Sequence, residues 1–330
     1  MKEKILEVKE LKTSFYTESG VVRAIDGVSF DVYKGETLGI VGESGCGKSV
    51  TSMSVLRLIP QPPGKIESGE ILFGGQDLTK INDEQMRQIR GNQISMIFQE
   101  PMTSLNPVFT IGYQIGEVLE LHRGISHKQN KEEIIKALNR VGIPRAEAVM
   151  NDYPFALSGG MKQRAMIAMA LACEPKLLIA DEPTTALDVT IQAQILKLML
   201  DLQRDTGMSI MFITHDLGVI AEVSDRVIVM YAGHIVEQAD VRSLFRKPLH
   251  PYTIGLLNSK PDLHTSDERL HVIPGNVPNL IKRPTGCQFH PRCEQCMEIC
   301  RKQMPPITEL PDGRMVRCWL HTDEGKEVAQ

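Results

Sequence analysis

The sequence predicts an α/β fold whose core sheet is mostly parallel, with an N-terminal antiparallel β subdomain, a helical subdomain and a cysteine-containing C-terminal extension. Apolar strands alternate with helices between residues 176 and 233, which is typical of a parallel sheet covered by helices. The continuous apolar run Thr37–Val41 leads directly into a glycine-rich turn, as expected of a strand buried on both faces.

The first 33 residues predict the antiparallel subdomain. Apolar and polar residues alternate from residue 5 to about residue 33, and the turn signal at Glu18–Gly20 divides them into two strands. A helix is expected from Lys48 to about Leu58, and a further buried strand at Ile94–Phe98.

Residues 108–172 predict the helical subdomain. Their helical periodicity comes in three pieces, with breaks near Gly124, Pro144 and Asn151–Pro154. Strand–helix alternation then resumes and degrades near residue 240 into proline-rich sequence. We therefore expect a domain over residues 1–240 and an extension over residues 241–330.

Composition excludes several classes of protein. With 42% hydrophobic and 24% charged residues among 330, the chain is an ordinary globular protein. A net charge of −4 provides no cationic field for nucleic acid. The amino end lacks a signal-peptide core, and the run at 165–173 is too short to cross a membrane. We expect a protein of the cytosol that reaches a membrane only through a partner.

The string GESGCGKS, Gly42 to Ser49, fits the phosphate-binding pattern G-x-x-x-x-G-K-[ST] between a strand and a helix. Its glycines allow successive backbone N–H groups to face a phosphate chain. Lys48 would reach the β- and γ-phosphates, and the Ser49 hydroxyl would bind Mg²⁺. Cys46 occupies a free position of the pattern and is interpreted as a small filler.

A second nucleotide motif is KLLIADEP, Lys176 to Pro183, a strand that ends in two carboxylates. Asp181 is expected to hold the Mg²⁺ shell and Glu182 to polarise the attacking water. Together, the two motifs predict an ATPase or GTPase.

The string LSGGMKQR, Leu157 to Arg164, closely resembles the signature of ABC ATPases, which are P-loop NTPases, and the resemblance covers about residues 5–240. It implies that Ser158, Gly159 and Gly160 open a helix facing the γ-phosphate held by a second subunit. It also implies a Q-loop glutamine at Gln99, a D-loop at Ala186–Asp188 and a switch histidine at His215.

The same resemblance implies an aromatic residue stacked on adenine, for which Tyr16 is the first choice and Phe15 the second. Glu182, His215 and Gln99 would be catalytic, and Ser49, Gln99 and Asp181 would bind magnesium. The full set expected to contact ATP is Tyr16, Gly42, Ser44, Gly45, Gly47, Lys48, Ser49, Val50, Gln99, Ser158, Gly159, Gly160, Asp181 and Asp188.

Three further strings resemble the oligopeptide, dipeptide and nickel importer branch of the family: residues 100–115, HPYTIGLL at 250–257, and residues 273–320. This branch implies a peripheral subunit on the cytoplasmic face of the cell membrane. Its partners would be a homologous ABC ATPase in a heterodimer, two transmembrane permease subunits and an extracytoplasmic substrate-binding protein. Di- and oligopeptides are the expected cargo; nickel or another small solute remains an alternative.

Five of the seven cysteines lie in the last fifth of the chain, and clustered thiols without an export signal favour metal or cluster ligands over disulfides. Sulfur suits iron–sulfur clusters and zinc alike. The resemblance implies a [4Fe–4S] cluster on Cys287, Cys293, Cys300 and Cys318. Zinc and unligated thiols stay open, as does the role of Cys296; His290 and His321 are interpreted as surface residues.

Two other classes of function compete with a transporter motor. Soluble ABC ATPases of translation or DNA repair also carry cysteine-rich modules, but they often have tandem cassettes or basic surfaces, and this chain has one cassette and a negative charge. A degenerate module that binds ATP without hydrolysis is disfavoured, since every catalytic position that the resemblance implies is filled.

Overall fold

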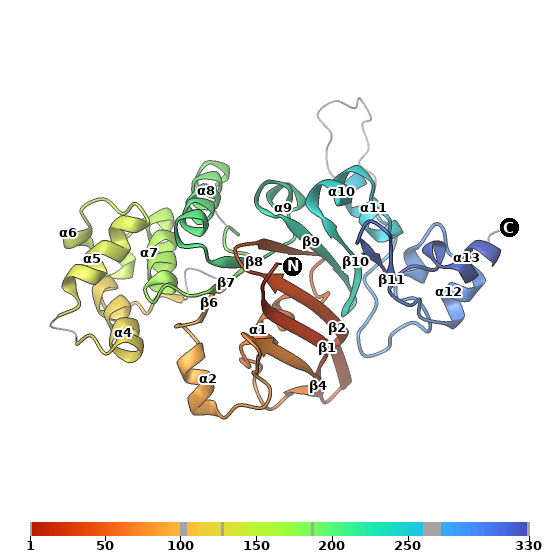
Figure 1. Cartoon of the computed structure of the whole chain (residues 1–330), viewed down its shortest axis with the longest axis horizontal. Helices are drawn as coiled ribbons and strands as arrows, with labels where there is room; N and C mark the ends of the chain where they lie inside the picture. The colour runs from red at the N-terminus through yellow and green to blue at the C-terminus, as the bar shows by residue number, and fades with distance from the viewer. Residues whose placement is uncertain (1, 100–103, 127–128, 186–187, 260–271, 329–330) are drawn as a thin grey trace. The chain divides into compact units, whose positions relative to one another are not determined.

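The computed structural model describes residues 2–99, 104–126, 129–185, 188–259 and 272–328, whose helices and strands are labelled in Figure 1. The chain divides into two compact units. The first unit comprises Met1–Leu6, Val32–Thr37 and Leu72–Ile213. The second unit comprises Glu7–Asp31, Leu38–Ile71 and Thr214–Gln330.

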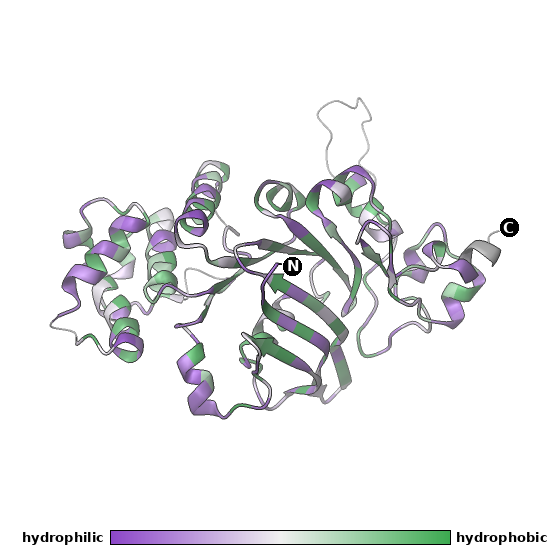
Figure 2. Ribbon diagram, viewed as in Figure 1, coloured by the Kyte–Doolittle hydropathy of each residue, from purple (hydrophilic) through white to green (hydrophobic). Residues whose placement is uncertain are grey.

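The second unit begins with the predicted N-terminal sheet. Its strands lie in the order β2 (Gly20–Tyr33), β1 (Lys4–Thr17) and β4 (Gly64–Phe73). Hydrophobic and hydrophilic residues alternate along these strands (Figure 2), because one face of the sheet is buried and the other is exposed to solvent. The short strand β5 (Gln76–Asp77) pairs antiparallel with the end of β4.

The rest of the second unit is built around five strands in the order β11, β12, β10, β9, β3. Strand β3 (Thr37–Val41) is parallel to β9 (Arg226–Tyr231), and β9 pairs antiparallel with β10 (His234–Asp240). The helices of this part are α1 (Lys48–Val55), α9 (Leu217–Val223), α10 (Val241–Arg246) and α11 (Pro251–Asn258).

The C-terminal residues add to the same sheet. Strand β12 (Met315–Val316) pairs antiparallel with β10 and with β11 (Thr308–Glu309). Short helices complete this part: η2 (His290–Arg292), α12 (Glu298–Lys302), η3 (Trp319–His321) and α13 (Asp323–Val328). The segment after residue 240, which the sequence showed only as irregular and proline-rich, therefore contains strands that extend the sheet.

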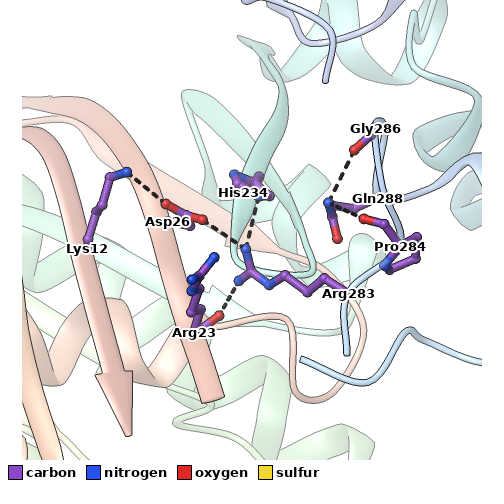
Figure 3. A network of polar contacts seen from close by, with 8 residues as sticks. All are labelled: Lys12, Arg23, Asp26, His234, Arg283, Pro284, Gly286 and Gln288. Carbon is purple, nitrogen blue, oxygen red and sulfur yellow. Dashed lines mark hydrogen bonds and ion pairs between the residues drawn. The ribbon is translucent and has the colours of Figure 1, made fainter. Parts of the chain in front are cut away.

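A largely buried arginine also attaches this extension to the N-terminal strands (Figure 3). The Arg283 guanidinium lies 3.1 Å from the Asp26 carboxylate and 3.3 Å from Nε2 of His234, and it donates to the carbonyl of Arg23. Lys12 pairs with the same Asp26 carboxylate at 3.0 Å. One guanidinium thus joins the extension to β2 and to the start of β10.

The first unit contains the parallel strands β8 (Ser209–Thr214), β7 (Leu177–Asp181) and β6 (Ile94–Ile97), in that order. Every residue of β7 and β8 is buried, which explains their continuous apolar sequence. Helices α2 (Asp83–Ile89) and α8 (Val189–Thr206) belong to the same unit.

The predicted helical subdomain forms within the first unit. The three expected breaks separate four α-helices rather than three pieces, because one helix ends at Arg140, before Gly142 and Pro144, and a short one fits between Pro144 and Asn151. These helices are α4 (Ile111–Arg123), α5 (Lys131–Arg140), α6 (Ala146–Val149) and α7 (Gly159–Leu171), with the 3₁₀ turn η1 (Pro154–Ala156) before the last. Within the described ranges, no helix has the length and apolar character that a membrane span requires.

Candidate functional site: a nucleotide-binding loop and a cysteine-lined cavity

The loop Gly42–Ser49 joins β3 to α1, the strand–loop–helix context that its sequence predicted. The Lys48 side chain is buried, and its ammonium group donates to the carbonyl oxygens of Gly42 at 2.7 Å and Glu43 at 3.2 Å. Helix α1 begins at Lys48, so its amino end and positive dipole face the loop. The loop has the form of a cradle for an anion.

Two glycines of this loop are required by geometry. Gly47 has φ 106°, and a Cβ there would stand 2.7 Å from the Ala24 carbonyl oxygen. At Gly42 a Cβ would meet the Met230 carbonyl oxygen at 2.3 Å. Strands β9 and β2 therefore pack so closely on the loop that no side chain fits at either position.

The remaining loop residues lie at the surface of the cradle or in its wall. Ser44 and Gly45 are exposed, Ser49 and Val50 are half-buried at the start of α1, and the Cys46 side chain is fully buried. Burial raises the pKa of the Cys46 thiol, so this residue packs as an apolar group, in agreement with its interpretation as a filler.

Tyr16, the first choice for an adenine platform, lies near the end of β1 in the same unit. Its side chain is 52% exposed, and its hydroxyl donates to the Glu67 carboxylate at 2.6 Å. The ring is therefore held at its far end while much of it remains accessible. Phe15 is half-buried and packs towards Gly64, which makes it the poorer platform.

In the first unit, Gln99 and Glu182 come together although 83 residues separate them. Nε2 of Gln99 donates to Oε2 of Glu182 at 3.2 Å, and the Thr185 hydroxyl donates to the same oxygen at 3.0 Å. Asp181 ends β7 and is buried. The two side chains that the sequence assigned to one site therefore contact each other directly.

Glu182 has an unusual backbone. Its φ is 47°, in the left-handed region that side chains rarely adopt, and its N–H donates to the Ile213 carbonyl at 2.8 Å. Strain of this kind costs on the order of 1–3 kcal/mol and persists where the surroundings enforce it, commonly at functional sites. The strain turns the carboxylate away from the direction that a continued strand would give it.

The signature residues begin α7. Ser158 is its N-cap and accepts from the Met161 N–H at 3.4 Å, and both Ser158 and Gly159 are exposed. A Cβ on Gly159 would meet nothing within 4 Å. The Gln163 side chain donates to the Pro183 carbonyl, so the signature helix is tied to the segment that carries Asp181 and Glu182.

The other two sequence-predicted positions, Asp188 and His215, lie at or just before the N-cap of a helix. Asp188 caps α8 by accepting from the Ile191 N–H at 2.9 Å, whereas Ala186 and Leu187 of the expected D-loop lie outside the described residues. His215 is exposed directly after β8, and the next residue, Asp216, caps α9.

Four cysteines of the second unit line one cavity. They are the four that the resemblance indicated: Cys287, Cys293, Cys300 and Cys318. The aromatic side chains Phe289 and Trp319 line the same cavity. Cys296 does not line it; its thiol donates to the Met297 carbonyl at 3.5 Å.

The thiols around this cavity are weak acids in the protein alone. Burial, together with the charge of the neighbouring cysteines, raises the pKa of Cys287 and of Cys293 to about 11 and that of Cys318 to about 12. All five tail cysteines are free of disulfides. Across the described part of the chain, no three His, Cys, Asp or Glu side chains stand close enough to hold a single metal ion.

The two histidines beside the cysteines are half-buried rather than at the surface. Nδ1 of His290 lies 2.9 Å from the Cys287 carbonyl oxygen, and Nε2 of His321 lies 3.0 Å from the Leu249 carbonyl oxygen. Each ring therefore has one nitrogen engaged by the backbone.

Two residues of the extension that the sequence did not single out, Tyr252 and Arg292, both contact Glu43 of the nucleotide-binding loop. The Glu43 carboxylate pairs with Arg292, and the Glu43 N–H donates to the Tyr252 hydroxyl. Tyr252 and Arg292 lie in strings used for the branch resemblance, which was the available signal, but no pattern connected them with residue 43.

Fold and loop together define a P-loop nucleotide-binding cassette, and comparison with known proteins agrees. Residues 25–185 match the ABC transporter family, and residues 236–300 match the C-terminal region of oligopeptide/dipeptide transporters. The chain belongs to the family of ABC transporter ATP-binding proteins, in its oligopeptide/dipeptide branch, and it is an ATPase of that type.

Curated relatives match along nearly their whole length. The oligopeptide transport protein OppD of Bacillus subtilis is 55% identical over 98% of this chain and 91% of its own. A probable peptide ABC transporter ATP-binding protein, y4tR of Sinorhizobium fredii, is 54% identical over 96% and 94%. The dipeptide transport protein DppD of Bacillus subtilis is 52% identical over 99% and 97%.

Solved structures show the same fold for the cassette. A dimeric post-hydrolysis state of the ATP-binding cassette MJ0796, bound to ADP and phosphate, is 26% identical with a TM-score of 0.64, covering 72% of this chain and 99% of that one. The protein cbiO1 of Clostridium perfringens, part of the ABC transporter complex cbiONQ, is 28% identical with a TM-score of 0.62, covering 74% and 92%.

Proposed function

We propose that this chain is the ATP-hydrolysing motor subunit of an importer for di- and oligopeptides. The observation that carries the cargo class is the match of nearly the whole chain, extension included, to subunits named for peptide transport. The observation that supports hydrolysis is the contact between Gln99 and Glu182.

Each residue of the nucleotide site has a role in this proposal. Tyr16 stacks on the adenine, and the loop Gly42–Ser49 with Lys48 binds the phosphates. Glu182 polarises the attacking water, assisted by Gln99 and His215. Mg²⁺, when bound by Ser49, Gln99 and Asp181, would neutralise charge on the phosphates.

The proposed partners follow from the exposed signature residues. Ser158, Gly159 and Gly160, with Asp188, would face a nucleotide on a homologous cassette, giving a heterodimer. Two permeases in the membrane and an extracytoplasmic binding protein complete the complex, and this subunit would lie at the cytoplasmic face of the membrane. An apolar pocket beside the Q-loop, lined by Met96, Phe98, Val118, Met166 and Met169, supports docking of a permease.

ATP closing the dimer would drive the permeases from inward- to outward-facing. A ligand shifts such an equilibrium only through its different affinity for the two states, so tighter ATP binding by the closed dimer would do the work. Hydrolysis would then reopen the dimer.

Replacement Glu182→Gln tests the motor. We expect ATP to bind normally and turnover in the assembled complex to fall by roughly 10²–10⁴, because the amide cannot polarise water. Glu222→Gln, at an exposed position of α9, is the matched control and should hydrolyse normally. An assembled Glu182→Gln complex with an ordinary ATPase rate would remove Glu182 from the mechanism.

Uptake by reconstituted vesicles tests the cargo. We expect labelled di- or oligopeptides, delivered by the complex's own binding protein, to accumulate only with ATP. Accumulation of nickel instead, with no peptide uptake, would establish the alternative cargo.

We further propose that Cys287, Cys293, Cys300 and Cys318 hold a [4Fe–4S] cluster. The cavity that these four cysteines share supports their role as the four ligands. Cys296, the fifth cysteine of the extension, does not line the cavity and is therefore not needed as a ligand. Four thiolates are the ligand set that such a cluster needs. The iron ions of a bound cluster would stabilise the thiolate form of these cysteines. In the protein alone, burial raises the pKa of the thiols and so disfavours that form.

Iron and sulfide analysis of anaerobically prepared protein tests the cluster. About four of each per chain are expected. Cys318→Ser should lower both, whereas Cys296→Ser should not. Zinc alone, or protein free of metal, would rule the cluster out.

A further inference from the structure

We propose that Arg292 is a positioning residue for nucleotide binding: it neutralises Glu43 inside the phosphate-binding loop, so that ATP affinity depends on the C-terminal extension. The inference rests on nucleotide binding at Gly42–Ser49 and assigns a further residue to that site. All of its contacts lie within the second unit.

The contact between the two residues is a two-point ion pair. Nη1 of Arg292 lies 2.7 Å from Oε2 of Glu43, and Nη2 lies 3.0 Å from Oε1. The Arg292 side chain is 5% exposed and that of Glu43 is 28% exposed. A planar guanidinium that meets both carboxylate oxygens fixes the direction of the carboxylate as well as cancelling its charge.

The surroundings hold the guanidinium in place. Nε of Arg292 donates to the Pro274 carbonyl at 2.9 Å, and Nη1 reaches the Tyr231 hydroxyl at 3.3 Å. The Glu43 N–H donates to the Tyr252 hydroxyl at 2.9 Å. The loop residue is therefore fixed through its side chain and its backbone by two residues of the extension.

An aromatic cluster packs around the Arg292 guanidinium and the Tyr252 side chain. The rings of Tyr231 and Tyr252 lie 4.6 Å apart between centroids, and Phe289 packs on both at 5.2 and 5.4 Å. The Arg292 guanidinium lies 5.8 Å from the centroid of the Tyr231 ring. These side chains are buried, so a displaced guanidinium would find no water to replace its partners.

The charge on Glu43 explains why the loop needs this arginine. The Glu43 carbonyl oxygen accepts from the Lys48 ammonium, the group expected on the β- and γ-phosphates. An unpaired carboxylate beside this point would repel a triphosphate. Paired with Arg292, it presents no net charge, and the loop keeps the positive field of Lys48 and the helix terminus.

Arg292 also connects the loop with the cysteine-lined cavity. The next residue, Cys293, lines that cavity, and Phe289 lines it three residues earlier. The helical turn η2 thus presents its arginine to the phosphate loop and the cysteine after it to the cavity. One short segment therefore borders both sites.

Direct binding of a fluorescent ATP analogue to the full chain tests the proposal, with Arg292→Gln, Glu43→Gln, the double variant and Arg292→Lys. We expect Arg292→Gln to weaken binding at least about tenfold, which corresponds to about 1.4 kcal/mol. Glu43→Gln should bind at least as tightly as the native chain. The double variant should recover most of the loss, because no unpaired carboxylate remains, and Arg292→Lys should lose less than Arg292→Gln.

Arg314→Gln is the matched control, since Arg314 is another buried arginine of the extension, paired with Asp312 and bonded to the Lys247 carbonyl. It should leave analogue binding unchanged. In the assembled complex, Arg292→Gln should raise KM for ATP and change kcat little.

Two results would overturn the proposal: Arg292→Gln binding the analogue like the native chain, or the double variant binding as weakly as Arg292→Gln. The second result would assign Arg292 to packing alone. A native chain that binds no nucleotide would instead refute the site itself. Should Arg292→Gln fail to fold, Arg292→Lys takes its place in the binding measurement. Binding of the analogue by Arg292→Lys as tightly as by the native chain would then overturn the proposal.

Discussion

The buried histidine of the β9–β10 hairpin makes the protein sensitive to acid. His234 is 8% exposed, and burial, together with the charges of Arg283 and Arg317, lowers its pKa from 6.5 to about 4 (Figure 3). Asp26 opposes this shift only in part. The nearby Arg283 donates to Nε2, which requires the neutral ring.

The sign and size of the effect follow from linkage between protonation and unfolding. As pH falls below 6.5, the unfolded chain takes up a proton at His234 before the folded chain does, so acid favours unfolding. A difference of 2.5 pKa units, from the two values above, amounts to about 3 kcal/mol once pH is below 4, and to about 2 kcal/mol at pH 5.

Replacement His234→Gln removes this proton site and keeps a polar side chain. We expect the native chain to lose about 2 kcal/mol more unfolding free energy than the variant between pH 7 and pH 5. Urea unfolding at both pH values measures the difference, and equal m-values show that the unfolded state is unchanged. An equal loss for both proteins would show that His234 takes up its proton at the same pH in the folded and the unfolded chain, and the reasoning would be wrong.

Two glycines give contrasting predictions. Gly47→Ala should destabilise the protein by at least about 1 kcal/mol and weaken ATP binding, because φ 106° and the Ala24 carbonyl leave no room for a Cβ; thermal unfolding and ATP titration measure both, and unchanged values would contradict the geometry. Gly159→Asp should fold normally, because a Cβ there meets nothing within 4 Å, and should abolish ATPase activity in the assembled complex by placing a carboxylate at the start of α7. Full activity in that variant would show that Gly159 does not face a nucleotide.

Local sequence patterns predicted most of the cassette because its main features depend on neighbouring residues. The strand Thr37–Val41, the loop after it and the helix from Lys48 are specified within 20 residues. The secondary structure of the C-terminal extension was harder to predict from the sequence. Strands β11 and β12 have two residues each, so no alternation marks them, and only their pairing beside β10 makes them strands.

The ion pair between Glu43 and Arg292 shows the limit of such patterns. The two residues are 249 positions apart, and nothing in the local sequence around either one specifies the other. The resemblance to a transporter branch marked the region around Arg292 without giving a reason for it. Only the packing of Tyr231, Tyr252 and Phe289 brings η2 to the loop, and packing between distant segments is not visible in sequence.

Glu182 illustrates a different limit, because its type was predictable and its conformation was not. An acidic pair after an apolar run predicts two carboxylates at the end of a buried strand, and it does not specify the backbone conformation of the second. With φ at 47°, the backbone turns at Glu182, and the carboxylate reaches Gln99 and Thr185. The hydrogen bond from its N–H to Ile213 holds that turn. Strand β8 therefore maintains the strained backbone conformation of Glu182.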